Sequence, residues 1–191
     1  IIDLNIQSNK VDLSAIRELI ITSPLLKEAQ QVLSPITSIK GFAEGTVTLK
    51  GNVNSVDLLD TVTLKFFPTT MVYEPFASPI EISDGSMIIT PDKVTVPEVN
   101  LKIFDTKTVI SGTVANLRGV PESDLTINLD RFNLQKVKQV ALSKFIPQDI
   151  KDVISAYEDL SGYVDINLLV KPGATKATLN FDNASAFYVP A

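Results

Sequence analysis

The ionisable side chains set the first limit on the chemistry of this chain. Its 191 residues include 22 Asp and Glu and 17 Lys and Arg, but no His, Cys or Trp. The absence of His and Cys excludes His-dependent triads, thiolate nucleophiles, disulfides and Cys- or His-ligated zinc. A catalyst would need carboxylates alone or a Ser/Lys arrangement. The formal net charge of −5 disfavours nucleic acid as a partner.

Two pairs of carboxylates, Asp57/Asp60 and Glu158/Asp159, are the candidates for acid–base work. Glu158 and Asp159 are adjacent and do not share a face, and Asp57/Asp60 lies at a predicted strand entry. Solvated surface charge explains both pairs better than a paired acid and base. No phosphate loop, dinucleotide fingerprint or Gly-x-Ser-x-Gly motif occurs. The sequence therefore predicts a protein that is not an enzyme and uses neither a cofactor nor a metal ion.

Positive charge is concentrated in one stretch near the C-terminal end. The stretch contains Arg131, Lys136, Lys138, Lys144 and Lys151. Such side chains can face anionic lipid headgroups. More often they form the solvated side of helices, and we favour that interpretation.

Hydrophobic periodicity predicts a strand followed by helix at the start of the chain. Residues 3–13 alternate apolar and polar side chains, which is typical of a strand. From residue 12 to 34 apolar residues recur at helical spacing, with Asp12 or Ser14 as the helix cap. Pro24 fits the first turn of a second helix.

Residues 41–130 consist of short alternating runs separated by turn signals, which is typical of an antiparallel meander. Asp84-Gly85 predicts a turn between two of these runs. Val96 and Val99 are three positions apart, so Pro97-Glu98 predicts a bulge that restores the alternation.

The C-terminal part returns to a mixture of strand and helix. It is predicted to contain a strand at 125–129, helices at 134–142 and 147–157, and strands at 162–168 and 177–181. Lys171-Pro-Gly173 predicts the turn between the last two strands.

Residues 2–51 and 123–170 resemble each other, which predicts an internal repeat. The matching positions are Asp3 with Asp124, Leu4 with Leu125, Ile6 with Ile127, Lys10 with Arg131, and Leu13 with Leu134. Each segment then leads through helix to a strand that starts with glycine, Gly45 in the first and Gly162 in the second. The alternative is coincidence between two amphipathic strand-plus-helix segments.

Four sequence motifs occur in a characteristic order along the chain. They are Asp-Leu-x-Ile…Val-Asp-Leu (3–13), Gly-x-Val-x-Leu-x-Gly (45–51), Pro-Ile-x-Ile-x-Asp-Gly-x-Met-x-Ile followed by Val-x-Val…Val-x-Leu-x-Ile (79–103), and Val-Ile-Ser-Gly-Thr-Val-x-Asn-Leu (109–117). Together they cover most of the chain, which resembles the AsmA-like superfamily with its TamB-type and YhdP-type envelope proteins. Each piece is unspecific alone, so their order carries the resemblance. The amount of helix departs from the most regular TamB-type repeats, and the subfamily stays open.

The resemblance implies a long sheet curled into an open groove, called a β-taco. It implies a periplasmic location in a parent chain anchored in the inner membrane of diderm bacteria. The function it implies is phospholipid transport and outer-membrane homeostasis, with neighbouring repeats and other envelope proteins as partners. Because the first residue is Ile1, we expect residues 1–191 to be a single domain from a longer chain.

The predicted fold is mainly β with helical insertions (α+β): an antiparallel meander curled into a groove-like open sheet or an incomplete barrel. The apolar face of such a sheet must be covered by a closed core, a helix or a lipid. The candidate groove residues are Val47, Leu49, Met87, Ile89, Val94, Val96, Val99, Leu101, Ile103, Ile166 and Leu168. For each of them the alternative is an ordinary place in a closed core.

The resulting hypothesis is a non-enzymatic segment of a bacterial envelope protein whose apolar groove shields phospholipid acyl chains. The alternative is a structural or protein-interaction β-domain that takes part in outer-membrane assembly without carrying lipid. A closed core without a cavity would favour the alternative.

Overall fold

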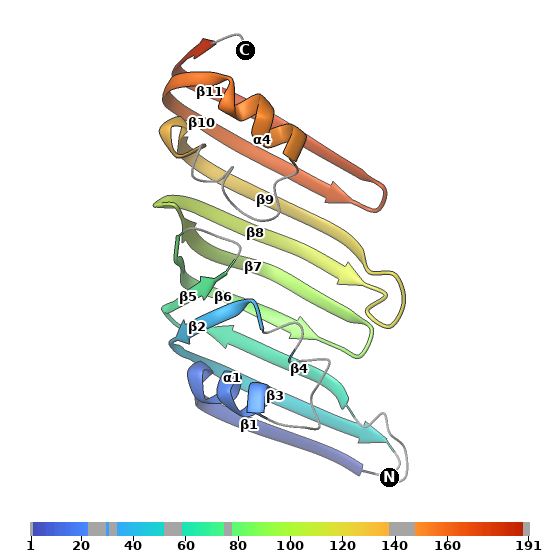
Figure 1. Ribbon diagram of the computed structural model, residues 1–191. Helices are drawn as coiled ribbons and strands as arrows, with labels where there is room; N and C mark the ends of the chain where they lie inside the picture. The colour runs from blue at the N-terminus through green and yellow to red at the C-terminus, as the bar shows by residue number, and fades with distance from the viewer. Residues whose placement is uncertain are drawn as a thin grey trace.

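The computed structural model describes residues 2–22, 30, 34–51, 59–74, 78–137 and 148–188. These residues form one antiparallel sheet of eleven strands that stays open (Figure 1). Its main path follows chain order, β1-β3-β4-β6-β7-β8-β9-β10-β11, and β2 and β5 form a branch beside β6. The prediction of a mainly β, antiparallel and open sheet is confirmed.

The strands are β1 (Ile2–Asp12), β2 (Ile36–Lys40), β3 (Phe42–Gly51), β4 (Leu59–Phe66), β5 (Thr69–Tyr73), β6 (Ile80–Ile89), β7 (Lys93–Ile103), β8 (Thr106–Ala115), β9 (Glu122–Asn133), β10 (Tyr157–Lys171) and β11 (Ala174–Tyr188). The helical segments are α1 (Leu13–Thr22), the 3-10 helix η1 (Leu134–Lys136) and α4 (Gln148–Ser155). Tyr157, predicted in a helix, instead begins β10, where it pairs with Tyr188 of β11.

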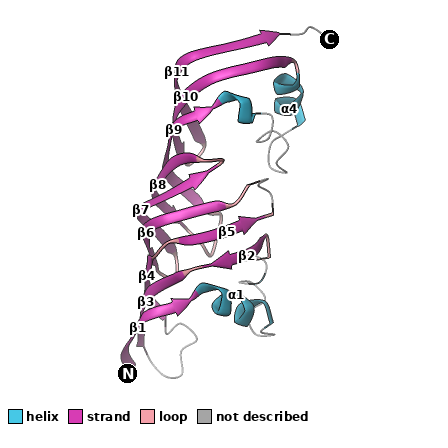
Figure 2. Ribbon diagram, turned by 90° about the vertical axis from the view of Figure 1, so that its left-hand side faces the viewer, coloured by secondary structure: helices cyan, strands magenta, loops and turns pink. Residues whose placement is uncertain are grey.

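The sheet is folded along a line that crosses its strands, which gives it two wings (Figure 2). In β6, residues 80–82 pair with β5, whereas residues 85–89 pair with β4. Gly41 separates β2 from β3 in the same way, and residues 67–68 separate β4 from β5. The prediction of a hairpin turn at Asp84-Gly85 is therefore wrong. The strand bends there and continues, because β7 pairs along both of its halves.

The predicted bulge at Pro97-Glu98 is confirmed. Between Val96 and Val99, β7 has one residue more than the facing stretch of β8. The extra residue resets the alternation of side chains. Val96 and Val99 consequently point to the same face of the sheet, although they are three positions apart.

The sheet has one apolar face and one polar face. Directly opposite residues of antiparallel strands point to the same side, so cross-strand pairs trace each face. Val62 lies opposite both Val47 and Ile89, which continues the apolar face across three strands. The next residue, Thr63, lies opposite Thr46 on the polar face. The wings bend toward the apolar face, the side on which the helices lie (Figures 1 and 2).

The buried core is small. Among the described residues the buried apolar side chains are Ile80, Val99 and Leu101 in one cluster, Phe104, Phe132, Leu134 and Val164 in a second, and Ala43. The accessible surface of the chain is 12199 Å². A compact monomer of this mass would expose about 8,900 Å². Among the described residues the apolar face of the bent sheet has no complete second layer, which agrees with this larger surface.

The described helices lie at the two ends of the sheet. Helix α1 contacts β1 and β2, whereas η1 and α4 contact β10. Leu134 of η1 is buried among Phe132 and Val164, which fixes this segment on the apolar face. Within the described part of the chain, the main helix–strand contacts leave out β4 to β8, although Lys136 of η1 reaches the Phe104 carbonyl oxygen in the β7–β8 turn. The rest of the predicted helices, at 23–29, 31–33, 138–142 and 147, lies outside the described residues.

The two segments of the predicted repeat pair their strands in the same register. β1 and β3 pair Leu4 with Leu49, and β9 and β10 pair Leu125 with Val170. Each residue of the second pair lies 121 positions after its counterpart in the first. The offset is the same for both strands of each segment. The helix-containing connections between the two strands therefore have the same number of residues.

The offset corrects the alignment of the second strand in each segment. The sequence pattern matched Gly45 with Gly162, but at this offset the counterpart of Gly162 is Gly41. Gly41 lies between β2 and β3, and Gly162 lies within β10 at φ +91°, where the pairing with β11 shifts register. The alignment failed because a glycine before an alternating strand is too common to fix a register.

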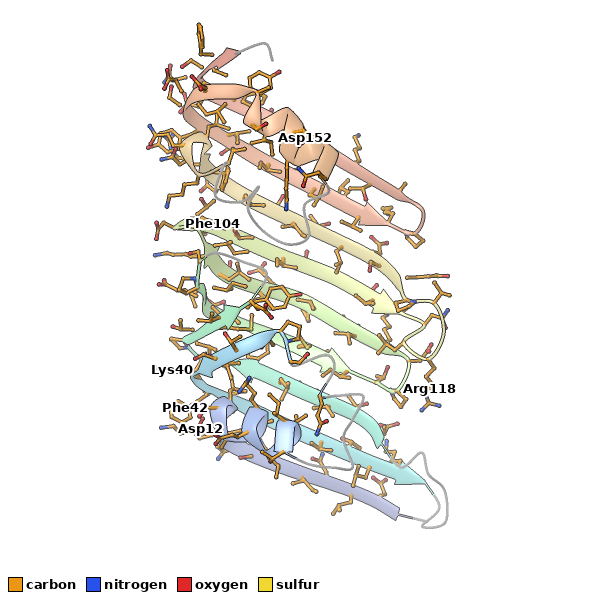
Figure 3. The ribbon with its side chains drawn as sticks, in the orientation of Figure 1. Asp12, Lys40, Phe42, Phe104, Arg118 and Asp152 are labelled. Carbon is orange, nitrogen blue, oxygen red and sulfur yellow. The ribbon has the colours of Figure 1, made fainter. Side chains whose placement is uncertain are left out.

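A cation–aromatic contact recurs at the same offset. The Lys10 ammonium lies 4.1 Å from the centre of the Phe42 ring, and the Arg131 guanidinium lies 4.4 Å from that of Tyr163. In Figure 3 Phe42 is labelled near the bend, next to α1. Each contact lies beside a bulge in the first strand of its segment. The bulge is therefore part of the repeated structure.

The cap of each helical excursion also recurs. The Asp12 carboxylate accepts a 2.8 Å hydrogen bond from the Ser14 backbone N–H, and the Asn133 side chain accepts a 2.9 Å bond from that of Gln135. Hydrogen bonds from the Ser14 hydroxyl and backbone hold the pKa of Asp12 below its usual value. This cap explains why α1 begins directly after β1.

Gly162→Ala is expected to lower the free energy of unfolding by about 2–4 kcal/mol, through left-handed strain and overpacking. Gly162 has a φ of +91°, and an added Cβ would lie 2.7 Å from the Ala184 Cα on β11. Gly173→Ala is the matched control, because Gly173 has a φ of +73° with no atom within 4 Å of an added Cβ. Urea unfolding of both variants measures the difference. Equal losses would contradict the close approach of the two strands.

Candidate functional site

The candidate site is the apolar face, and the register places all eleven predicted groove residues on it. They are Val47 and Leu49 on β3, Met87 and Ile89 on β6, Val94, Val96, Val99, Leu101 and Ile103 on β7, and Ile166 and Leu168 on β10. Most of their cross-strand partners are also apolar. The apolar face continues over the strands between them, from β1 to β11. The residues of these strands that point to this face are uncharged.

Sequence reasoning left out several residues of this face. They are Leu4, Ile6, Val62, Leu64, Phe66, Ile110, Val114, Leu125, Ile127 and Leu129. The alternation of Leu125, Ile127 and Leu129 is visible in the sequence. What the sequence does not show is that β9 lies between β8 and β10, which brings these side chains beside Ile166 and Leu168.

The candidate residues differ in how far the protein itself covers them. Val99 and Leu101 are each 7% exposed and pack against Ile80. The other nine are only half-buried, including Ile89 and Val94 on the middle strands. A ligand on this face would therefore touch the half-buried positions, and Val99 and Leu101 belong to the core beneath it.

The polar face carries the ion pairs of the sheet. Its cross-strand pairs include Lys65–Glu44 at 4.0 Å, Lys50–Asp60 at 3.9 Å and Lys171–Asp124 at 3.6 Å. These pairs are exposed to solvent and contribute little to stability. Ile88, Val109 and Leu169 are aliphatic exceptions on this face. The contrast between the faces makes the sheet amphipathic across its thickness.

The structure places the residues of the predicted cationic stretch in different surroundings. Arg131 forms a 3.1 Å ion pair with Asp182, and Lys136 donates a 2.9 Å hydrogen bond to the Phe104 carbonyl oxygen. Lys136 also pairs with Asp105, and its hydrogen bond and charge lower the pKa of that carboxyl. These two cations thus have protein partners. Lys151 lies on α4, and Lys138 and Lys144 lie outside the described residues.

The described members of the two predicted carboxylate pairs, Asp60, Glu158 and Asp159, lie on solvent-accessible strand segments. Asp60 pairs with Lys50, and Asp57 lies outside the described residues. Glu158 and Asp159 are exposed at the start of β10. Over the described ranges, no group of three or more His, Cys, Asp or Glu side chains could hold a metal ion.

Comparison with protein-family models, curated proteins and solved structures finds no match to this chain. In the described part of the chain, no helix has both the length and the apolar character needed to span a membrane.

Proposed function

We propose that this chain is a non-enzymatic segment of a bacterial envelope protein that shields phospholipid acyl chains on its apolar face. The observation that carries the proposal is the face itself: it runs across nine strands of the main path, and the described helices lie only at its ends. The resemblance to AsmA-like proteins supports a periplasmic location, in a parent chain anchored in the inner membrane.

The dimensions of the face suit an acyl chain that lies across the strands. Nine strands spaced about 4.8 Å apart span about 38 Å, whereas one leaflet contributes half of a hydrocarbon core that is about 30 Å thick. Each buried CH₂ group contributes about 0.8 kcal/mol. Binding of this kind is non-directional, so we expect weak selection among headgroups.

Site-specific photo-crosslinking in the full-length protein tests the proposal. Val94 and Thr95 are adjacent on β7 and both half-buried, but Val94 lies opposite Val114 on the apolar face and Thr95 lies opposite Thr113 on the polar face. A photoreactive residue at position 94 is expected to label phospholipid, and one at position 95 is expected not to. Mass spectrometry of the adducts measures both.

Other outcomes of this experiment separate the alternatives. Lipid adducts from neither position would overturn the acyl-chain proposal. Protein adducts from position 94, without lipid, would instead favour a structural or protein-interaction domain in outer-membrane assembly. Equal lipid labelling from positions 94 and 95 would indicate non-specific contact with membrane.

A further inference from the structure

The outer edge of β11 is the most exposed strand edge on the main path. Every residue from 174 to 187 is exposed, with Leu179 at 48% and Phe181 at 62%. The strand contains no proline, and its charged residues Lys176 and Asp182 are of opposite sign. Its fifteen residues run along the end of the sheet (Figure 1).

The first segment of the repeat shows which kind of strand pairs with such an edge. β11 pairs with β10 as β4 pairs with β3, which makes Leu179 the counterpart of Leu64 and Phe181 that of Phe66. On its other side β4 is covered by β6, and there Leu64 and Phe66 are only half-buried. Among the described residues, β11 thus lacks the second antiparallel neighbour that β4 has in β6.

The pairing of β4 with β6 gives the pattern that such a neighbour should have. Gly85 lies opposite Phe66, Met87 opposite Leu64, and Ile89 opposite Val62. Read along β6, the apolar face carries a glycine followed by two large apolar side chains.

β11 itself has this pattern. Ala177 is small and is followed by the larger Leu179 and Phe181, and all three share the apolar face. An antiparallel copy of β11 centred on Leu179 would place Ala177 opposite Phe181, as Gly85 lies opposite Phe66.

The polar face of β11 is self-complementary in the same register. With Leu179 opposite its own copy, Lys176 of one chain stands opposite Asp182 of the other, on both sides of the axis. Asp182 retains 52% side-chain exposure beside Arg131. Opposite charges directly across a strand pair are favourable, whereas like charges are not.

We propose that the outer edge of β11 is a docking site for a second copy of this chain, joined through an antiparallel, two-fold β11–β11 pair centred on Leu179. The two-fold axis is perpendicular to the sheet at the joint. Both apolar faces therefore lie on the same side and form one continuous surface. The joint itself does not depend on lipid, so it is tested separately from the proposed function.

Single cysteines test the register, because the chain contains no native cysteine. Leu179→Cys is expected to form a disulfide dimer under mild oxidation, since directly opposite Cα atoms lie about 4.5–5.5 Å apart, within disulfide reach. At the proposed joint, residue 178 of one chain lies opposite residue 180 of the other, and neither residue lies opposite its own copy. The test therefore uses Thr178→Cys and Asn180→Cys. A mixture of these two variants is expected to cross-link, whereas each alone is not.

Charge exchange provides the second measurement. Lys176→Glu and Asp182→Lys each place two like-charged pairs at the joint, and each is expected to weaken self-association several-fold in sedimentation equilibrium. A mixture of the two restores both pairs and is expected to form a heterodimer. Leu4→Cys on β1 is the control for the opposite edge and is expected to stay uncross-linked.

The proposal would be overturned by a monomer at all accessible concentrations, or by the absence of a disulfide in Leu179→Cys. Efficient cross-linking through Leu4→Cys instead would place the contact on β1. Equal cross-linking of Thr178→Cys alone and in the mixture would indicate random collision and not a fixed register.

Discussion

Ile89→Asp is expected to reduce the phospholipid that co-purifies with the full-length protein by about ten-fold or more. The half-buried Ile89 lies opposite Val62 and Val94 in the middle of the apolar face. A carboxylate there would lose hydration against an acyl chain, and such unpaired burial of charge costs several kcal/mol. Because about 1.4 kcal/mol corresponds to a ten-fold change in binding, even partial burial gives a measurable loss.

Ile88→Asp is the matched control for this variant. Ile88 is the same residue type on the same strand and is also half-buried, but it lies opposite Thr63 and Thr95 on the polar face. Lipid extraction followed by mass spectrometry should show wild-type amounts for Ile88→Asp. Far-UV circular dichroism checks that both variants retain the sheet. An equal loss of lipid from both variants would show that the apolar face has no special part in binding.

Phe132→Ala is expected to cost about 3–5 kcal/mol of stability, the usual range for removing a buried phenylalanine side chain. Phe132 is 6% exposed and packs with Phe104, Leu134 and Val164 in the cluster that holds η1 on the sheet. Its loss leaves a cavity beneath η1. Urea denaturation measures the change in the free energy of unfolding.

The counterpart of Phe132 in the first segment provides the comparison. Val11 lies 121 positions earlier, is only half-buried, and faces Ala43 where Phe132 faces Val164. Val11→Ala removes two carbon atoms from a partly exposed site and is expected to cost about 1 kcal/mol. Equal losses from the two variants would contradict the difference in packing between the two ends of the sheet.

The alternation of single strands could be predicted from the sequence, because a residue's face depends on local spacing. The bulge at Pro97-Glu98 was predictable for the same reason: only one extra residue keeps Val96 and Val99 on one side. The bend at Asp84-Gly85 was not, because the same dipeptide serves a hairpin turn or a kinked strand. Which of the two forms depends on whether β7 pairs along both halves.

The register of the repeat needed the structure. Gly41 and Gly45 are both glycines near the start of β3, and local sequence favours the wrong one, because the alternation after Gly45 resembles that after Gly162. Pairing across the sheet decides between them, because Ala43 lies opposite Val11 as Val164 lies opposite Phe132. The apolar character of the candidate site could be predicted, but the full set of strands that form it could not. Its residues on β4, β8 and β9 join the face only through their neighbours.

The agreement between strand order and chain order has a consequence for how the molecule comes apart. Along the main path each strand touches only the strands next to it, so the sheet resembles a linear array in which stability is the sum of nearest-neighbour terms. Such an array need not unfold all at once, and its ends open at lower free energy than its centre. In the monomer, amide hydrogens of β1 and β11 should exchange first and those of β7 and β8 last.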